Sequence, residues 1–302
     1  GVLYDPAGID REELLRLAKA RQMVEHFARD RLGAEGFFVH IDDRDVKLPD
    51  GSSIESGLSF RNNFHLDARS SADLFVPCGG RPDAVHINNV KSLFHDDGSA
   101  RFKIVVEGAN LFFTQAARRQ LESAGVVLYK DASANKGGVT SSSLEVLASL
   151  ALSDEEHDAN MCVKHEQRPD FYARYVDATV TRIVDNARAE LDCIWREHER
   201  TGRARCELTD AVSVKINAIN DQIQASSLWQ NNKLLSHVLR EAVPDVLLEL
   251  VGLDTLLKRV PRSYLKAIFG AHLASRYVYS HGLAATEVEF LTFLQPYLAA
   301  GE

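Results

Sequence analysis

The sequence has few cysteines, and none of them is arranged for metal binding or cross-linking. It contains neither a CxxC pair nor a histidine cluster at ligand spacing. Such scattered cysteines are typical of reduced thiols and exclude an obvious disulfide framework or zinc site. We therefore expect no bound metal and a reducing compartment, the cytoplasm or alternatively the mitochondrial matrix. The four cysteines are Cys78, Cys162, Cys193 and Cys206.

Long apolar runs and excess positive charge are also lacking. No stretch approaches the roughly 18–20 uninterrupted apolar residues that a membrane-spanning helix needs. Lys plus Arg number 35 against 43 Asp plus Glu, and this net charge of −8 argues against nucleic acid or an anionic membrane as the main partner. A chain of 302 residues, 45% hydrophobic and 26% charged, has ordinary globular composition and room for two domains.

The first residues carry no targeting signal. "GVLYDPAGID" lacks Met, a basic segment and an apolar core. Because this opening resembles the middle of a domain, we expect the chain to be a fragment of a longer protein.

The N-terminal 70 residues mix helix and strand patterns. After a strand tail or turn at 1–5, apolar residues at helical spacing predict a helix over 8–32, with Asp10 as its N-cap. The stretch 36–68 predicts a small β insertion, in which 60–66 is a further short strand. Within it, "HIDDRD" has residue types that bind metals, but its adjacent spacing favours a solvated acidic turn.

A regular alternation follows. Apolar strands are predicted at 72–77, 102–108 and 126–131, and they alternate with a helix or helical turn at 83–94 and a helix between Thr114 and Gly125. Strands that alternate with amphipathic helices predict an α/β fold with a doubly wound parallel sheet. In such sheets ligands bind beyond the carboxyl ends of the strands.

Strand patterns stop near residue 150, and the remainder is predicted to be helical. Apolar residues at helical spacing mark one long helix by Phe171, Tyr175, Ala178, Ile183, Ala187, Leu191 and Ile194, and a second by Val212, Ile216, Ile219 and Ile223. We therefore place a sheet domain at 1–152 and a helical region at 153–302. Trp195 and Trp229 are interpreted as helix-packing residues.

The predicted strand ends carry polar and glycine-rich loops: "PCGGRP", "EGANLFFT" and "KDASANKGG". Asn110 and Asn135 each offer an amide donor and acceptor, which is what a nicotinamide carboxamide requires. Gly137 and Gly138 permit close backbone approach and open a helix whose N-terminus favours an anion. The hydroxyls of Ser141–Ser143 add donors for a carboxylate.

Each loop also has an alternative explanation. "NKGG" followed by serines is good capping chemistry for any helix, and Asn110 can satisfy backbone groups in a turn. Proline and glycine after a strand commonly mark only its end. Lys136 is either a solvated charge or a neighbour of anionic ligands. The functional interpretation rests on all three loops occurring at successive strands of one sheet.

Together these motifs resemble the glutamate dehydrogenase family of amino-acid dehydrogenases. "VEGANLFFTQAARRQL" and "YKDASANKGGVTSSSLE" match the family's two asparagine motifs in residue identity, order and spacing. "ADLFVPCGGRP" occupies the position of the family's proline-alanine-alanine loop. The β insertion, "PCGGRP" and "ASANKGGVTSSS" are similar to the large NAD-specific branch. The resemblance covers most of 1–10 and 73–152, whereas the tail matches only in being helical.

The resemblance implies an incomplete Rossmann-like NAD-binding domain and roles for individual residues. Asn110 and Asn135 would contact the nicotinamide and its ribose, beside Pro77, Cys78 and Gly79. The substrate-binding residues would be Gly138, Val139 and Ser142, with Ser142 binding the γ-carboxylate of glutamate. The branch implies NAD as cofactor, L-glutamate, 2-oxoglutarate and ammonia as substrate and products, and a homo-oligomeric parent protein.

The sequence departs from the family pattern in what it lacks. It contains no GxGxxG, and nothing in residues 1–72 resembles the motifs of the family's catalytic lysine and aspartate, so no catalytic residue is assigned. We therefore expect an NAD-dependent glutamate dehydrogenase whose fragment is inactive alone. Two alternatives are a non-catalytic nucleotide- or ligand-sensing module and a helical assembly domain.

Overall fold

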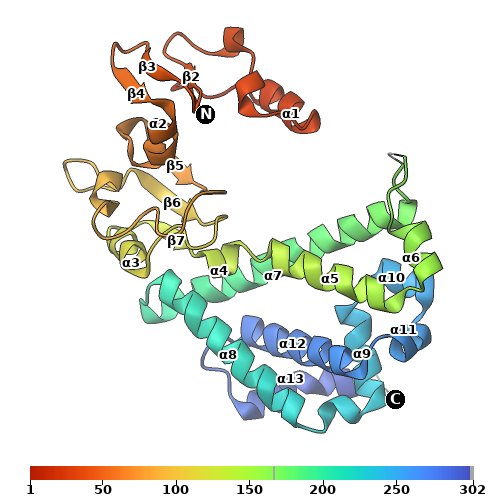
Figure 1. Ribbon diagram of the computed structural model, residues 1–302. Helices are drawn as coiled ribbons and strands as arrows, with labels where there is room; N and C mark the ends of the chain where they lie inside the picture. The colour runs from red at the N-terminus through yellow and green to blue at the C-terminus, as the bar shows by residue number, and fades with distance from the viewer. Residues whose placement is uncertain (166, 300–302) are drawn as a thin grey trace.

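The computed structural model describes residues 1–165 and 167–299. Its first half holds all the strands that it describes, and its second half is a layered arrangement of helices (Figure 1). Within the described part of the chain, no helix combines the length and apolar character needed to cross a membrane.

The first 66 residues include two small antiparallel sheets with their own apolar core. β1 (Val2–Tyr4) pairs with β2 (Phe37–Val39), and β3 (Arg44–Lys47) pairs with β4 (Ser53–Ser56). These strands confirm the predicted β insertion. Its last predicted strand was wrong, because the hydroxyl of Ser56 accepts the Ser59 N–H and starts a helix, α2 (Gly57–Asn63).

The helix predicted over 8–32 is correct only in its first half. α1 (Arg11–Lys19) begins where expected, since the Asp10 carboxylate accepts the Glu13 N–H at 2.9 Å. Arg21 then takes a left-handed conformation (φ 53°), which a helix cannot continue through. The chain folds back as two 3-10 turns, and the Glu13 carboxylate accepts the Ala28 N–H at 3.1 Å. This tertiary hydrogen bond outweighs the helical periodicity beyond Lys19.

Gly57 has no room for a side chain. A Cβ there would lie 1.8 Å from the backbone oxygen of His40. We expect Gly57→Ala to lower the free energy of unfolding by about 1–3 kcal/mol, because the two backbones must separate. Urea denaturation measures this, with Ser59→Ala on the exposed side of α2 as the control. Equal stability of the two variants would show that the backbones are not in contact.

The predicted parallel sheet is confirmed. β5 (Ala72–Phe75), β6 (Phe102–Val106) and β7 (Val127–Tyr129) form a parallel sheet in that order, with Leu74 opposite Ile104 and Ile104 opposite Val127. α3 (Gln115–Ser123) is capped by Thr114, as predicted. Leu74 and Ile104 are 51% and 39% exposed, whereas Phe102, Val105 and Leu128 are buried in the core that α3 helps to form.

Beyond β7 the described chain is almost entirely helical, as predicted. The long predicted helices are α7 and α8, and an apolar core joins α5 to the C-terminal helices. The helices are α4 (Asp131–Ala134), α5 (Gly137–Ala151), α6 (Asp154–Asn160), α7 (Asp170–Thr201), α8 (Arg205–Ala225), α9 (Asn232–Ala242), α10 (Asp245–Val251), α11 (Leu253–Arg259), α12 (Arg262–His281) and α13 (Glu287–Ala299).

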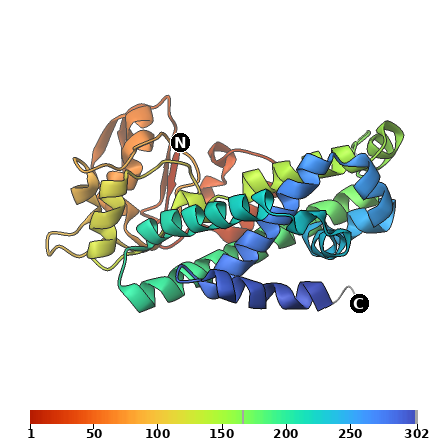
Figure 2. The same cartoon turned by 90° about the horizontal axis from the view of Figure 1, so that it is seen from below.

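The sheet and the helical region are joined by polar contacts as well as by the chain. The Glu122 carboxylate, at the end of α3, accepts the N–H groups of Arg205 and Cys206 at 2.7 and 3.0 Å. These are the first residues of α8, where a negative charge stabilises the helix dipole. Figure 2 shows α8 running from the sheet along the helical region. The division at residue 152 stays a prediction.

Candidate cofactor and substrate site

The loops that follow the three parallel strands meet at one edge of the sheet. Gly108, after β6, packs so closely on the loop after β5 that a Cβ would lie 3.2 Å from both Cys78 Sγ and Pro77 O. Pro77 is buried, while Cys78 and Gly79 are exposed. The loops after β5 and β6 are therefore in contact, as their place in a parallel sheet requires.

Asn110 and Asn135 form the centre of this edge. The Asn135 Nδ2 donates a hydrogen bond of 2.9 Å to Asn110 Oδ1. Asn110 is exposed and Asn135 is half-buried, so the pair is accessible. Among the described residues, Asn110 Nδ2 and Asn135 Oδ1 have no other partner, which leaves one amide donor and one acceptor free. A carboxamide ligand offers the complementary acceptor and donor.

A buried ionic cluster holds the Asn110 loop. Leu111 has φ 58°, and its N–H donates to Asp131 Oδ2 at 2.7 Å. Arg118 donates to both oxygens of Glu107 at 2.7 and 2.8 Å, and its Nη2 lies 3.4 Å from Asp131 Oδ1. Burial raises the pKa of the Glu107 carboxyl, and the Arg118 charge opposes that rise. The cluster fixes the left-handed turn directly after Asn110.

A second buried network holds the Asn135 loop on the helical region. Glu190 of α7 is 1% exposed, and its carboxylate accepts the Ser133 hydroxyl and the Tyr279 hydroxyl, each at 2.7 Å. Lys136 Nζ forms an ion pair with the same carboxylate. Interpreting Lys136 as a solvated charge was therefore wrong, because a buried carboxylate needs a counter-ion. Ser133 and Lys136 flank Asn135, so α7 determines where its amide lies.

The first two turns of α5 carry the predicted substrate residues. The Ser141 and Ser143 hydroxyls donate to the backbone oxygens of Gly138 and Val139 at 3.0 and 2.9 Å. Ser142 is exposed, and within the part of the chain that is described its hydroxyl has no partner. Gly138 and Val139 lie four and three residues before Ser142, so each is a neighbour of Ser142 on the helix surface. That face can offer a hydroxyl donor to a carboxylate.

Asn135 differs from its predicted setting in one respect. The one-turn helix α4 (Asp131–Ala134) separates it from β7, and its backbone N–H donates to Asp131 O at 2.7 Å. The helical turn brings Asn135 back to Asn110. No hydrogen bond between described residues joins Ser142 to the asparagine pair, so its place in the same site remains a prediction.

Four charged residues that hold these loops were not predicted from the sequence: Glu107, Arg118, Asp131 and Glu190. Glu107 directly follows β6, and Asp131 is the first residue of α4, two residues after β7; both carboxylates are buried. Arg118 lies beside Ala117 and one turn before Leu121 on the buried face of α3. An ionisable residue at an apolar position is the available signal for such a cluster. Glu190 carried no comparable signal, because its partners are far away in the sequence.

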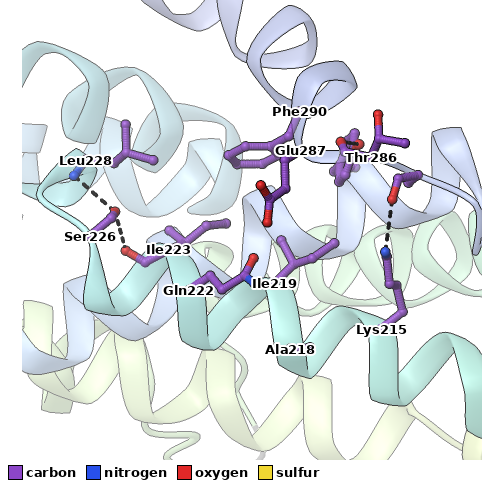
Figure 3. Close-up of a pocket in the computed structure, with 12 residues that line it drawn as sticks. Lys215, Ala218, Ile219, Gln222, Ile223, Ser226, Leu228, Thr286, Glu287 and Phe290 are labelled. Carbon is purple, nitrogen blue, oxygen red and sulfur yellow. Dashed lines mark hydrogen bonds between the residues drawn. The ribbon is translucent and has the colours of Figure 1, made fainter.

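A separate cavity lies within the helical region (Figure 3). It has a volume of about 280 Å³ between α8, α12 and the start of α13, and residues such as Ile219, Ile223 and Phe290 line it. Lys215 Nζ donates to Ala285 O at 2.9 Å at one end of the cavity. None of the predicted site residues lines this cavity. Among described residues, no group of three or more His, Cys, Asp or Glu side chains is placed to hold a metal ion.

The fold and the loops define the class of protein: an α/β protein with a parallel sheet and a cluster of polar groups beyond the strand ends. A family model described as Glutamate/Leucine/Phenylalanine/Valine dehydrogenase matches residues 1–202. The chain belongs to this family. The match extends beyond the sheet and includes all of α7.

Individual relatives are similar to almost the whole chain. "Glutamate dehydrogenase 2" of Dictyostelium discoideum is 54% identical over 295 residues, which are 98% of this chain and 28% of that protein. The "NAD-specific glutamate dehydrogenase" of Neurospora crassa is 49% identical over 297 residues, or 97% of this chain and 28% of that protein. The Saccharomyces cerevisiae protein of the same name is 42% identical over 304 residues, with 97% and 28% coverage.

The chain thus spans a little over a quarter of the length of these relatives. The alignments include the helical tail, which corrects the interpretation that the tail matches the family only in being helical. The tail and the sheet are similar to one and the same set of proteins.

Proposed function

We propose that the protein is an NAD-dependent glutamate dehydrogenase in which this chain orients the nicotinamide and forms one wall of the substrate pocket. The observation that carries the proposal is the hydrogen-bonded pair Asn110–Asn135 at the carboxyl ends of parallel strands. The names of the similar proteins support glutamate as substrate and NAD as cofactor.

The residues present fit the cofactor's polar end. Asn110 Nδ2 would donate to the carboxamide oxygen, and Asn135 Oδ1 would accept from its NH₂ group. Pro77, Cys78 and Gly79 would line the same face. The bound cofactor supplies the hydride acceptor for oxidation at the α-carbon of glutamate. The contribution of this chain is to fix the position and orientation of the ring.

The substrate wall is proposed to be the exposed face of α5. Ser142 would donate its hydroxyl to the γ-carboxylate of glutamate, beside Gly138 and Val139. A hydroxyl at this position discriminates against apolar amino acids, because an apolar side chain would leave the donor without a partner. L-Glutamate, 2-oxoglutarate and ammonia are the reactants that this assignment implies. We also propose a homo-oligomeric protein located in the cytoplasm.

The first test separates binding from turnover. We expect the 302-residue chain alone to produce no NADH from glutamate, and a protein that spans the full length of the relatives to do so. In the active protein, Asn110→Leu and Asn135→Leu each raise the KM for NAD by about tenfold or more, because each removes one amide contact. Ser142→Ala raises the KM for glutamate and leaves that for NAD unchanged.

The control for the asparagine variants is Asn160→Leu, a substitution in α6 outside the proposed site. Unchanged NAD kinetics in both asparagine variants would contradict the assignment of the pair. NADH formation by the isolated chain would show that catalysis needs nothing beyond these residues.

A further inference from the structure

A second pocket adjoins the loop after β5. It has a volume of about 370 Å³ and lies between α2, the loop at 79–84 and the ring of Phe112. We call it the Arg61–Arg81 pocket. Its lining contains Arg61, Asn62, His65, Gly79, Gly80 and Arg81, and no carboxylate. In a chain of net charge −8, a pocket lined by two guanidinium groups and no acid is suited to an anion.

The two arginines are not neutralised by the protein. Arg61 Nη1 donates to Asn62 Oδ1 at 3.0 Å, and Arg81 Nη2 lies 3.5 Å from Asn62 O. Neither forms an ion pair with any residue that the structure describes, whereas nearby Arg69 pairs with Asp50 and Asp67. Their guanidinium groups therefore keep donors available for an external acceptor.

His65 adds little positive charge to the pocket. Burial lowers the pKa of its imidazole, and the Arg81 charge lowers that pKa further, against a hydrogen bond to the Ala84 backbone. The lowered pKa favours the neutral imidazole, so the positive charge of the pocket comes mainly from Arg61 and Arg81.

The backbone of the pocket lining also has hydrogen-bond donors. The N–H groups of Gly79, Gly80 and Arg81 donate to no acceptor within residues 1–165 and 167–299. Gly80 has φ 139°, and a Cβ there would lie 2.9 Å from the Phe112 ring. Only glycine permits this backbone to lie against Phe112. Free backbone N–H groups that line a pocket can donate hydrogen bonds to an anion.

We propose that the Arg61–Arg81 pocket binds a phosphate group. Two guanidinium groups and a row of backbone N–H groups match the several acceptor oxygens of a phosphate. Gly79 belongs both to this pocket and to the proposed cofactor face. The phosphate group can therefore be part of the cofactor that is proposed to bind at Asn110, and this source rests on the proposed function. The other source is a separate phosphate compound.

The direct test is a titration of the isotope-labelled 302-residue chain with inorganic phosphate, with chloride keeping the ionic strength constant. We expect saturable shifts of the Gly79 and Gly80 amide resonances. The double variant Arg61→Gln/Arg81→Gln weakens phosphate binding by about tenfold or more. Arg44→Gln is the matched control, since Arg44 lies outside the pocket and donates to Ser56 Oγ.

The result that overturns the proposal is a linear, unsaturated response, or equal affinity in the double variant and the control. The spectrum of each variant also shows whether it is folded. A double variant that is unfolded is replaced by the single variants Arg61→Gln and Arg81→Gln, each expected to weaken binding several-fold.

Two further ligands identify the source of the phosphate. Nicotinamide mononucleotide and nicotinamide riboside differ by one phosphate. If the cofactor supplies it, the mononucleotide displaces inorganic phosphate and loses affinity in the double variant, while the riboside is unaffected. If AMP displaces phosphate and the mononucleotide does not, the pocket takes a separate nucleotide. If the riboside shifts the side-chain amide resonances of Asn110 and Asn135 but no ligand binds through a phosphate at the pocket, the proposed function is upheld and this inference is refuted.

Discussion

Arg118→Met is expected to lower the free energy of unfolding by about 3–5 kcal/mol. Glu107 is fully buried, Asp131 is 6% exposed, and Arg118 stands between them. Removing the guanidinium leaves two carboxylates in the interior without a counter-ion. Methionine keeps most of the side-chain volume, so the loss reports the charge and not a cavity. Urea denaturation followed by circular dichroism measures it.

Arg119→Met is the matched control. Arg119 is the next residue of α3 and forms an ion pair with Glu207. The Arg119 side chain is 61% exposed. Exposed pairs of this kind contribute about 0–1 kcal/mol. Similar losses in the two variants would show that the buried cluster has no special role in stability. We also expect Arg118→Met to weaken nicotinamide binding, because the Asp131 contact to the Leu111 N–H positions Asn110.

Glu190→Leu is expected to be comparably destabilising, by about 3–5 kcal/mol. The change leaves the Tyr279 hydroxyl without its acceptor, leaves Ser133 with Thr209 alone, and removes the counter-ion of Lys136. Glu190→Gln is expected to cost less, because its amide oxygen still accepts one hydroxyl hydrogen bond.

Glu199→Leu provides the control within the same helix. Glu199 is exposed and accepts a hydrogen bond of 2.8 Å from Trp195 Nε1. We expect a change within about 0.5 kcal/mol there. Hydrogen exchange at the backbone amide of Asn135 should accelerate in Glu190→Leu and not in Glu199→Leu. Unchanged exchange at Asn135 would mean that α7 does not hold its loop.

Much of the fold could be predicted because its signals are local and repeated. β5, β6 and β7 are apolar runs separated by turn residues, and α3 is marked by a threonine cap. Parallel strands place their carboxyl ends together, so the approach of Asn110 and Asn135 followed from topology.

The remaining features depend on contacts between residues that are distant in sequence. α1 ends early because Ala28 binds back to Glu13, and α2 replaces a strand where Gly57 lies against the His40 backbone. The spacing of apolar residues along the sequence does not predict either contact. The same applies to Glu190, whose partners come from α4, the loop after it and α12. Only the three-dimensional structure shows that these contacts hold the Asn135 loop.

The attachment of Asn135 to α7 constrains how the family can vary. A chimera that combines the strands of one dehydrogenase with the C-terminal helices of another would separate Ser133 and Lys136 from Glu190 and Tyr279. Such a recombinant would lose the contacts that hold the Asn135 loop unless both parents have the same residues there. Substitutions at positions 136 and 190 should accordingly be inherited together, so that the charge balance of the pair is maintained during divergence.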